Sequence, residues 1–446
     1  MDLETLRSET EAGRVDTVLV AAVDMQGRLQ GKRLTAKHFL DEVVEHDAGG
    51  CSYLLAVDVE MNTVGGYEMT SWAQGYGDFA YKPDLETLRY VPWHECTAMV
   101  MCDLELKDGT PVLASPRHLL KSQLGRLAER GLEALVGTEL EFLVFRDTYQ
   151  EAWRKGYRDL EPATRYNVNY SLLDTARLEP LLRRIRNSMV GAGLPVETAV
   201  GECNSGQHEI NLRFGTALAV ADGHAIYKNG AKEIAAQEGY SISFMPKFDE
   251  DAGNSCHIHL SLRDREGDAA FAGPQGLSKR FQGFLAGQLA CVRELMLFFA
   301  PNINSYKRYS DYSAAPTRVA WGRDNRTCAF RIVGQGSSLR IENRVPGGDA
   351  NPYLAIAAML AAGIHGMDRN LALEEELAGD AYAATGKPSF PKSLQEAREL
   401  FANGEVVREA FGEEVVDHYL NMARVEIEAF EAAVTDWERY RNFERT

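Results

Sequence analysis

The stretch VGTELEFLVF at residues 136–145 constrains the fold more than any other part of the sequence. Its apolar and aromatic residues predict a buried strand, yet it carries Glu139 and Glu141. Alternate residues of a strand share a face, so both carboxylates point the same way, about 6–7 Å apart. Such a pair fits either a solvated sheet edge or a divalent cation, because Mg²⁺ prefers carboxylate oxygens. This stretch alone leaves both interpretations open.

The chain has 446 residues, more than a single hydrophobic core usually serves, so two domains are expected. Residues 1–110 predict a small β-rich domain, with two strands within 15–34 joined by a Gly-containing turn and further strands near 52–57 and 97–104. The second domain, residues 111–446, is predicted to open with a helix at 116–129, because its apolar residues recur at helical spacing.

Strands and helices are expected to alternate through the second domain. The predicted strands are 136–145, 207–213, 240–248, 256–262, 328–333 and 339–345, and the predicted helices are 173–193, 217–238, 277–298 and 350–366. The tail from about 393 to 440 is predicted to be mostly helical. The fold class is therefore α+β, with a mostly antiparallel sheet backed by helices.

Composition narrows the functional classes. A net charge of −17 argues against nucleic acid as a partner, since phosphate binding needs a basic surface. No apolar run is long enough to cross a membrane, the N-terminal residues are not signal-like, and seven cysteines show no paired spacing. We therefore expect a cytoplasmic protein with no membrane partner. Residues 307–344 hold eight Lys or Arg against three acids, which suggests a buried anion site.

Two further motifs place metal-ligating side chains together. GECNSGQHE at 201–209 sets Glu202 and Glu209 at the ends of a turn that can fold both carboxylates toward one ion. NSCHIHLS at 254–261 places His257, His259 and Ser261 on one strand face. Imidazole can bind a metal or donate to a phosphate oxygen. A polar loop and hydrogen-bonded strand histidines remain the structural alternatives.

The motif LRIENR at 339–344 aligns Arg340, Glu342 and Arg344 on one face. A salt-bridged ladder would explain it structurally. However, arginines also stand at 308, 323, 326 and 331, and guanidinium holds carboxylate and phosphate oxygens bidentately. The sequence contains no G-x-x-x-x-G-K-[ST] loop, so metals and arginines would have to hold any nucleotide phosphates.

The ordered motifs resemble those of the glutamine synthetase superfamily. They are TELEF at 138–142, GECNSGQHEI at 201–210, NSCHIHLSL at 254–262, NSYKR at 304–308, WGRDNR at 321–326 and RIENRVPGGDANPYLAIAAMLAAGIHG at 340–366. The resemblance implies a β-grasp-like N-terminal domain and a catalytic domain. It also implies ATP as co-substrate, two to three Mg²⁺ or Mn²⁺ ions per site, and phosphorylation of glutamate before an amine displaces the phosphate.

Residue roles follow from the same resemblance. Metal ligands would be Glu141, Glu202 and Glu209 for one ion and Glu139, His257 and Glu342 for another. ATP would contact His259, Ser261, Arg326, Arg331 and Arg340. Arg308, Arg344 and Gly253 would bind the glutamate, and Arg326, Arg308 and Glu342 would act directly in catalysis. Members of the superfamily form a double ring of two hexamers, and a dodecamer is expected here.

The sequence departs from ammonia-using members at one sub-site. YSDYSAAP at 309–316 has Ala314 where they have a glutamate, and GGCSYLLAVDVE lacks their D-G-S-S motif. Without those carboxylates a pocket holds ammonium poorly, so a larger primary amine is expected. The first choice is ethanolamine, from similarity to γ-glutamylethanolamide synthetases. A polyamine, with Asp311, Asp58 or Glu60 as an acidic wall, is the alternative. Ordinary glutamine synthetase, a non-catalytic pseudoenzyme and a metal hydrolase also remain.

Overall fold

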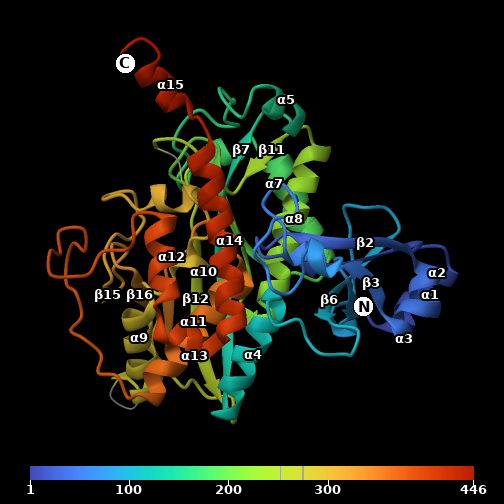
Figure 1. Ribbon diagram of the computed structural model, residues 1–446, viewed down its shortest axis with the longest axis horizontal. Coiled ribbons are helices and arrows are strands. Elements are labelled where there is room, and N and C mark those ends of the chain that lie inside the picture. The colour runs from blue at the N-terminus through green and yellow to red at the C-terminus, as the bar shows by residue number, and fades with distance from the viewer. Residues whose placement is uncertain (252, 274–275) are drawn as a thin grey trace.

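The computed structural model describes residues 1–251, 253–273 and 276–446. Its strands form two main sheets, and the helices cluster largely around the second (Figure 1). The small sheet belongs to the N-terminal part of the chain, at the right of Figure 1, and the large sheet to the remainder. This arrangement confirms the predicted α+β class.

The small sheet has the order β2-β1-β6-β4-β3, with β5 pairing β6. Its strands are β1 (Thr17–Val23), β2 (Leu29–Thr35), β3 (Ala48–Cys51), β4 (Asp78–Pro83), β5 (Arg89–Tyr90) and β6 (Thr97–Glu105). The predicted β1–β2 hairpin and β6 are confirmed, and β1 pairs β6 in parallel. Helices α1 (Leu3–Glu11), α2 (Ala36–His38) and α3 (Val44–His46) accompany this sheet.

The strand predicted near 52–57 is wrong. Ser52–Leu55 is a 3-10 helix, and the strand lies just before it, at Ala48–Cys51. Two of its four residues are glycines, which have little intrinsic strand preference, so the sequence does not indicate a strand there. Gly50 is nevertheless required there, since a Cβ would come within 2.0 Å of the Tyr81 ring on the paired strand.

The large sheet has the order β15-β16-β17-β12-β7-β9-β8, with β10 and β11 also pairing β7. Its strands are β7 (Leu132–Phe145), β8 (Val196–Gly201), β9 (Gln207–Leu212), β10 (Gly215–Thr216), β11 (Ser241–Ser243), β12 (Cys256–Asp264), β15 (Trp321–Arg323), β16 (Phe330–Val333) and β17 (Arg340–Asn343). A separate pair is β13 (Ala272–Gly273) with β14 (Gly276–Leu277). Only β15 and β16 are parallel among the described pairings of this sheet, which confirms the antiparallel prediction.

The helices of this part are α4 (Pro116–Glu129), α5 (Tyr149–Arg154), α6 (Leu172–Thr175), α7 (Glu179–Gly191), α8 (Ala217–Gln237), α9 (Lys279–Cys291), α10 (Met296–Phe299), α11 (Pro352–Asp368), α12 (Leu394–Ala402), α13 (Glu405–Phe411), α14 (Glu413–Ala432) and α15 (Asp436–Asn442). Two predicted helices, 173–193 and 277–298, are each broken in two. In the first, a new helix begins at Glu179 with Pro180 in its first turn, where the missing N–H of proline costs no helical hydrogen bond. The predicted strand 240–248 shortens to β11, since Pro246 has no N–H for a ladder.

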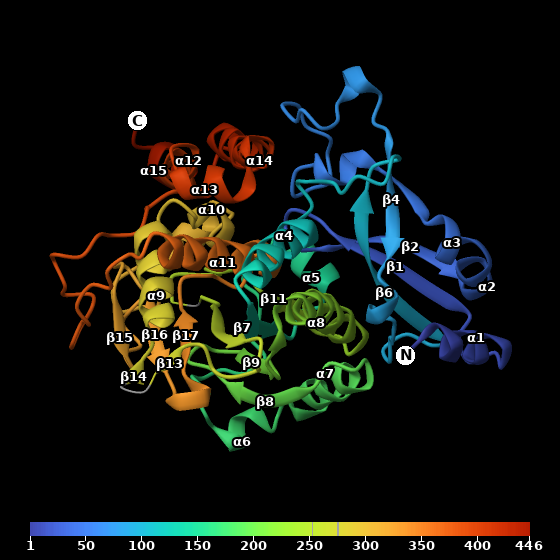
Figure 2. The same ribbon diagram turned by 90° about the horizontal axis from the view of Figure 1, so that it is seen from below.

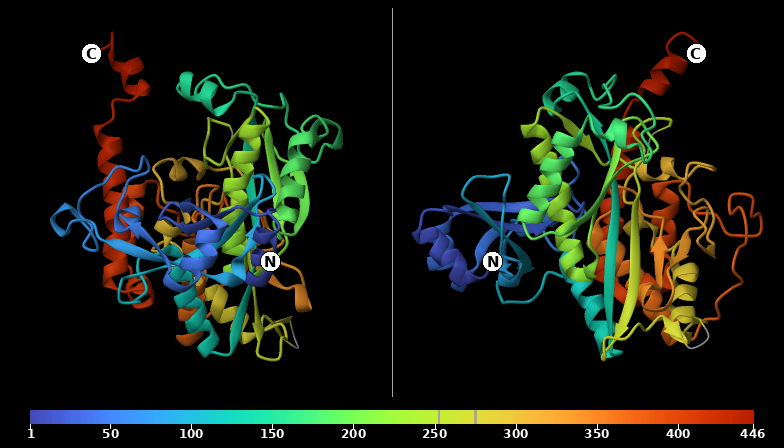
Figure 3. Two further views of the ribbon diagram at one scale, coloured as in Figure 1. Left: turned by 90° about the vertical axis from the view of Figure 1, so that its right-hand side faces the viewer. Right: turned by 180° about the vertical axis from the view of Figure 1, so that it is seen from behind.

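The helices lie in layers against one face of the large sheet. Helices α4 and α8 contact β7, and α11 contacts α4, α8 and α9. Figure 2 shows α12 to α14 outside α11, with the strands on its other side. Residues Pro352–Ile364 of α11 are accordingly buried all around the helix. The opposite face of β7 and β12 is free of helices and is seen from behind in Figure 3.

The small sheet docks through the tip of its β1–β2 hairpin. Asn351, at the start of α11, donates from Nδ2 to the carbonyls of Asp24 and Met25, both at 3.1 Å. His418 of α14 places Nε2 3.0 Å from the Met25 sulfur. At the other end of α14, the short helix α15 projects from the body with the C-terminus (Figures 1 and 3). Within the described residues, every helix is too short or too polar to span a bilayer.

Candidate active site

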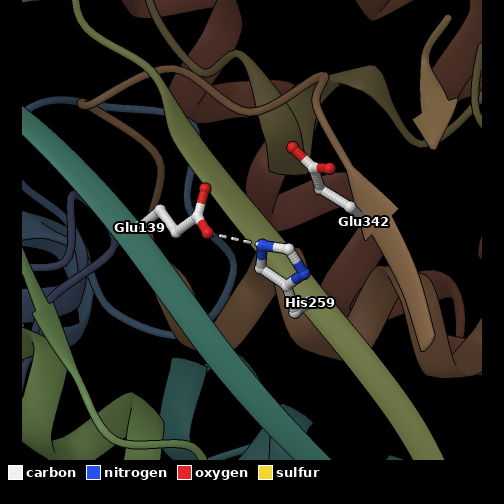
Figure 4. Close-up of side chains that lie close together, drawn as sticks. All are labelled: Glu139, His259 and Glu342. Atoms are coloured by element: carbon white, nitrogen blue, oxygen red, sulfur yellow. Dashed lines mark hydrogen bonds and ion pairs between the residues drawn. The ribbon is translucent and has the colours of Figure 1, made fainter. Parts of the chain in front are cut away.

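Strand register brings the predicted acidic and imidazole side chains together. Glu139 on β7 pairs with His257 on β12, and His259 on β12 pairs with Glu342 on β17. The helix-free face of the sheet thus carries all four. Glu139, His259 and Glu342 each place one ligand atom so that the three atoms lie within 4.8 Å of one another (Figure 4). This spacing suits a metal ion, and the group shares Glu139 and Glu342 with one predicted ligand set.

His257, the third member of that predicted set, lies at the same place. Its Nδ1 is 3.3 Å from Glu139 Oε2 and 3.6 Å from Glu342 Oε1. Its Nε2 is buried without a hydrogen-bond partner. Because buried polar atoms are nearly always paired, this nitrogen is suited to bind a ligand.

His259 is oriented differently. Arg340 donates from Nε to His259 Nδ1 at 3.1 Å, and arginine has no acceptor. Nδ1 is therefore the accepting nitrogen, and Nε2 carries the hydrogen that it donates to Glu139 Oε1 at 2.8 Å. This chain from Arg340 through His259 fixes the orientation of the Glu139 carboxylate.

The charge states of Glu139 and Glu342 follow from their neighbours. Burial raises the pKa of the Glu139 carboxyl, but hydrogen bonds from His257 and His259 outweigh it, so the pKa is lowered. Burial also raises the pKa of the Glu342 carboxyl, but attraction to His257 and to the Arg344 guanidinium outweighs it, so this pKa is lowered as well. Both groups are thus anionic at neutral pH and available to a cation.

The second predicted ligand set, Glu141, Glu202 and Glu209, lies beside the first. Glu141 on β7 pairs with Glu209 on β9, and Glu202 follows the end of β8. Burial, followed by repulsion from Glu141, raises the pKa of Glu202 to about 7. Burial and repulsion from Glu139 and Glu141 raise the pKa of Glu209 to about 8. Clustered carboxylates that repel one another in a buried place fit a divalent cation, which removes the repulsion.

Three supporting residues were missed by the sequence analysis. Gln207 donates from Nε2 to Glu141 Oε2 at 3.1 Å and to the Gly253 carbonyl at 2.7 Å. The Ser255 N–H donates to the same Glu141 oxygen at 2.6 Å, and Asn211 Nδ2 donates to Glu209 Oε1 at 2.7 Å. Gln207 and Ser255 stand within the quoted motifs, so their neighbourhood was a signal, although their roles depend on tertiary contacts.

Two adjoining cavities open on this face. The first, of about 640 Å³, contains the predicted catalytic groups Glu139, Glu141, Glu202, Glu209, His257, Arg326, Arg331, Glu342 and Arg344. The second, of about 520 Å³, contains His259, Ser261 and Arg340. Glu139, Thr198 and Asn211 line both. The predicted metal-binding and nucleotide-binding residues therefore border one continuous region.

Of the three predicted glutamate-binding residues, one lines the first cavity and two do not. Arg344 lines the first cavity and is buried, with its Nε unpartnered. Arg308 and Gly253 are not among the residues that line either cavity. Arg308 donates to the Val345 carbonyl at 2.8 Å and to Ser255 Oγ at 3.0 Å, so it supports a residue of the wall.

Ala314 lines the first cavity together with Glu202 and the loop Asn169–Leu172. Its φ is 64°, in the left-handed region, where a residue with a Cβ is strained. Asp311, Asp58 and Glu60, the acids considered for a polyamine, are not among the residues that line this cavity. In the described chain the cavity that Ala314 borders is thus lined by polar side chains, such as Asn169, Ser171 and Glu202, together with the larger Tyr170 and Leu172.

Comparison with known proteins identifies the family. Residues 113–442 match the catalytic domain of glutamine synthetase. The chain is 60% identical to the γ-glutamylethanolamide synthetase GlnA4 of Streptomyces coelicolor over 445 residues, covering 100% of this chain and 96% of that protein. It is 37% identical to a glutamate–isopropylamine ligase of a Pseudomonas species, covering 97% of this chain and 96% of that protein.

Solved structures agree with this assignment. The complex of GmaS with ADP superimposes with a TM-score of 0.86 at 27% identity, covering 98% of this chain and 99% of that one. The ligand-free form of GmaS also gives a TM-score of 0.86, at 28% identity. The fold, the order of the motifs and these matches lead to one conclusion: the chain belongs to the glutamine synthetase family.

Proposed function

We propose that this protein is an ATP-dependent ligase that joins the γ-carboxylate of glutamate to a small primary amine, with ethanolamine as the preferred substrate. One observation carries the proposal: the cavity that holds the carboxylates, His257 and the arginines has Ala314 at its edge. The carboxylates, His257 and the arginines suit phosphoryl transfer. Ala314 leaves space where ammonia-using members carry a carboxylate. The similarity to an ethanolamide synthetase and an isopropylamine ligase supports the same substrate class.

The chain's own residues can carry the phosphorylation step. Arg326 and Arg331 lie on the wall of the first cavity and Arg340 on that of the second, where they would bind the phosphates of ATP. His259 accepts from Arg340 and donates to Glu139, so it holds both side chains in place, and Ser261 adds a hydroxyl donor to the same cavity wall. Preorganised donors of this kind stabilise the charge that develops during phosphoryl transfer.

Glutamate would bind beside the acidic cluster. Arg344, with its unpartnered Nε, offers a buried charged donor for a carboxylate. Arg308 would support this sub-site through Ser255, and the carbonyl of Gly253, held by Gln207, would accept from the amino group. Alignment of the γ-carboxylate with the terminal phosphate is the main contribution of these contacts, because correct positioning lowers the barrier to transfer.

Two divalent cations would be held here, one by Glu139, His257 and Glu342 and the other by Glu141, Glu202 and Glu209. All six residues line the first cavity, and the unpartnered Nε2 of His257 supports its assignment as a ligand. Mg²⁺ or Mn²⁺ at these places would neutralise phosphate charge and orient the oxygens. Glu342 is held by Arg331 at 2.8 Å and also pairs with Arg344, so it connects the metal ligands to both anion-binding groups.

Ethanolamine is favoured over a polyamine. A polyamine carries a second ammonium and needs an acidic wall, whereas Asp311, Asp58 and Glu60 do not border the cavity in the described chain. Ethanolamine needs only a hydroxyl partner, and Ser171 and Thr175 lie on the cavity wall. Ordinary glutamine synthesis is disfavoured by the alanine at 314, because ammonium binding requires carboxylates.

The assembly is proposed to be a cytoplasmic dodecamer of two hexameric rings. Exposed aromatic side chains support an assembly: Trp72 in the small domain is 78% exposed, and Phe443 at the C-terminus is 87% exposed. Phe443 follows the exposed Trp437 and Tyr440 of α15 at three-residue spacing, so the three rings share one side of this helix end, and a contiguous apolar patch is typical of an interaction surface. Light scattering at working concentration tests this, and a monomer would contradict it.

The experiment for the function measures phosphate release from ATP with glutamate and Mg²⁺, with ammonium, ethanolamine, putrescine, spermidine or isopropylamine as nucleophile. Mass spectrometry identifies each product. Ethanolamine should give the highest kcat/KM. Glutamate labelled with ¹⁸O in the γ-carboxylate should pass one label to the released phosphate, as an acyl phosphate requires. Dominant turnover with ammonium or a polyamine would overturn the substrate, and no turnover with any amine would indicate a pseudoenzyme.

A further inference from the structure

A third cavity, of about 610 Å³, lies away from the acidic cluster. Its walls come from the tip of the β1–β2 hairpin, one face of α8, the segment from Ile242 to Pro246 and the segment Asn302–Asn304. It therefore forms at the junction of the small and large sheets. Figure 1 shows β2 reaching toward α8 and α14 at this junction.

The cavity contains an unusual group of lysines. Lys228 and Lys232 stand one turn apart on α8, and both ammonium groups lie over the Phe244 ring, at 5.4 and 5.7 Å from its centre. Lys307 is a third lysine on the wall. Within the described residues, none of the three lies within ion-pair distance of a carboxylate. Like charges at i and i+4 repel each other, so the helix is stabilised if an anion binds between them.

Lys228 is the half-buried member of this group, whereas Lys232 and Lys307 are exposed. Burial, followed by repulsion from Lys232, lowers the pKa of Lys228 to about 8. The Lys228 ammonium donates to the Gly348 carbonyl at 2.7 Å, which fixes its position without neutralising it. Arg28, also on the wall, is already paired with Asp24. The lysines are thus the cations that remain available to a ligand.

Two acids also line the cavity, but within the described residues neither forms an ion pair with a lysine. Asp349 accepts through Oδ2 from Asn302 at 2.7 Å and from Ser305 at 2.6 Å, and its charge offsets only part of the effect of burial on Lys228, whose pKa stays lowered. Burial, followed by repulsion from Asp58, raises the pKa of Glu426 and so disfavours its charge. The rest of the wall is largely apolar and includes Leu29, Ile242, Phe244, Met245, Ile303 and Phe430.

We propose that this junction cavity is a second ligand site, which binds a small organic anion with an apolar body. The carboxylate or phosphate of the ligand lies between Lys228 and Lys232, and its apolar part lies against Ile242, Met245 and the Phe244 ring. The inference does not rest on the proposed function, because none of these residues lines the catalytic cavity.

A hydrogen-bonded path joins this wall to the catalytic cavity. Asn254 donates from Nδ2 to the carbonyls of Ser243 and Met245, at 3.2 and 2.9 Å. Its Oδ1 accepts from Gln207 Nε2 at 3.0 Å, and that nitrogen also donates to Glu141. A ligand that displaces the segment from Ser243 to Met245 therefore shifts a support of the catalytic carboxylates, and occupancy of the junction cavity changes turnover.

Binding is tested by fluorescence titration of the whole protein with the anionic dye 8-anilinonaphthalene-1-sulfonate. We expect saturable binding at one site per chain. The double variant Lys232→Ala/Lys307→Ala should raise the Kd by about tenfold or more, since hydrogen bonds to charged groups are strong. The matched control, Lys107→Ala/Lys392→Ala, removes two exposed lysines elsewhere and should leave the Kd unchanged.

Further arms separate this site from other surfaces. The uncharged analogue N-phenyl-1-naphthylamine should bind more weakly than the sulfonate dye. Phenylacetate or phenyl phosphate should displace the sulfonate dye. The competitor with the lower Kd indicates whether the natural ligand carries a carboxylate or a phosphate. The proposal is overturned if the double variant binds the dye like the wild type, if the neutral dye binds equally well, or if neither competitor displaces it. Turnover unaffected by saturating dye would overturn the coupling to the catalytic cavity.

Discussion

The two ends of the catalytic cavity are built from different kinds of structure. The proposed metal and phosphate end is carried largely by neighbouring strands, β7, β9, β12 and β17, whose register fixes which side chains meet. The proposed amine end is carried by the segment around Ala314 and by Asn169–Leu172, which leads into α6. We infer that the strands carry the phosphoryl-transfer chemistry, which relatives can share, and that the loops decide which nucleophile is used.

Strands and loops respond differently to sequence change. A shift of one residue in strand register moves every side chain to the opposite face, so the strand-borne residues can only change together. A loop accepts substitution with little effect on the rest of the fold. The comparison predicts that substitutions at the strand end abolish activity with every amine, whereas those at the loop end change which amine is used.

The largest effect is expected for Glu139→Gln on β7. This change removes the charge shared by His257 and His259 and one carboxylate of the metal-binding group. Turnover should fall by about a hundredfold to a thousandfold with every amine tested, as for loss of one charge-stabilising group. Glu133→Gln, at an exposed position on the same strand, is the control and should retain activity. A loss confined to one amine would contradict the comparison.

A smaller effect is expected for Arg344→Lys. Lysine keeps the charge but cannot offer two parallel donors, so one charge-assisted contact with glutamate is lost. Such a contact is worth about 1.5–3 kcal/mol, so the KM for glutamate should rise by about ten- to a hundredfold. Steady-state kinetics with ATP varied separately should show an unchanged KM for ATP. Arg369→Lys, at the exposed C-terminal end of α11, serves as the control.

The strand-borne part of the site could be predicted from the sequence in large part. Glu139, Glu141, His257 and His259 were placed on one face because a strand has a fixed period of two, and the structure has them there. Glu342 joins them because β17 pairs with β12, and the register between these two distant strands cannot be predicted from either strand alone. The roles predicted for these residues, and the division of the chain near residue 110, remain predictions.

What could not be predicted depends on contacts between distant segments. Gln207 supports Glu141 only because β9 pairs β7. Asn254 accepts from Gln207 while it donates to the carbonyls of Ser243 and Met245, so its role also depends on tertiary contacts. The strand at Ala48–Cys51 was missed because two of its four residues are glycines, and Gly50 is required by its close approach to Tyr81 of β4 rather than by strand preference. Tertiary packing thus overrides local propensity at such positions.

At the loop end, Ala314→Glu should alter specificity without abolishing chemistry. The backbone there is already left-handed with an alanine, so the longer side chain adds no new backbone strain. A carboxylate at this place should lower the KM for ammonium and reduce kcat/KM for ethanolamine, each by about tenfold. Ala314→Gln is the matched control, because it adds the same bulk without charge. A fall in activity with both nucleophiles alike would mean that the loop serves the chemical step.

The smallest effect concerns the helix-facing side of β9. His208 is buried, both ring nitrogens lack partners, and burial lowers its pKa to about 4. Between about pH 6.5 and pH 4, the unfolded chain therefore binds a proton that the folded chain does not. In this range the free energy of unfolding decreases by about 1.4 kcal/mol for each unit by which the pH is lowered.

His208→Phe removes this titration. Urea unfolding at pH 6.5 and 5 should show a loss of stability smaller by about 2 kcal/mol than in the wild type, with catalytic specificity unchanged. His38→Phe, at an exposed position, is the control. An identical pH dependence in the His208 variant and the wild type would show that this side chain is protonated in the folded protein.

The most direct test of the account is a competition between nucleophiles in one reaction. ATP, glutamate and Mg²⁺ are mixed with equal concentrations of ethanolamine and ammonium, and the ratio of γ-glutamylethanolamide to glutamine is measured by mass spectrometry for the wild type and for Ala314→Glu. The account predicts a large excess of the ethanolamide in the wild type and a shift toward glutamine in the variant. Glutamine as the main wild-type product would contradict the proposed division between a strand-borne catalytic end and a loop-borne amine end.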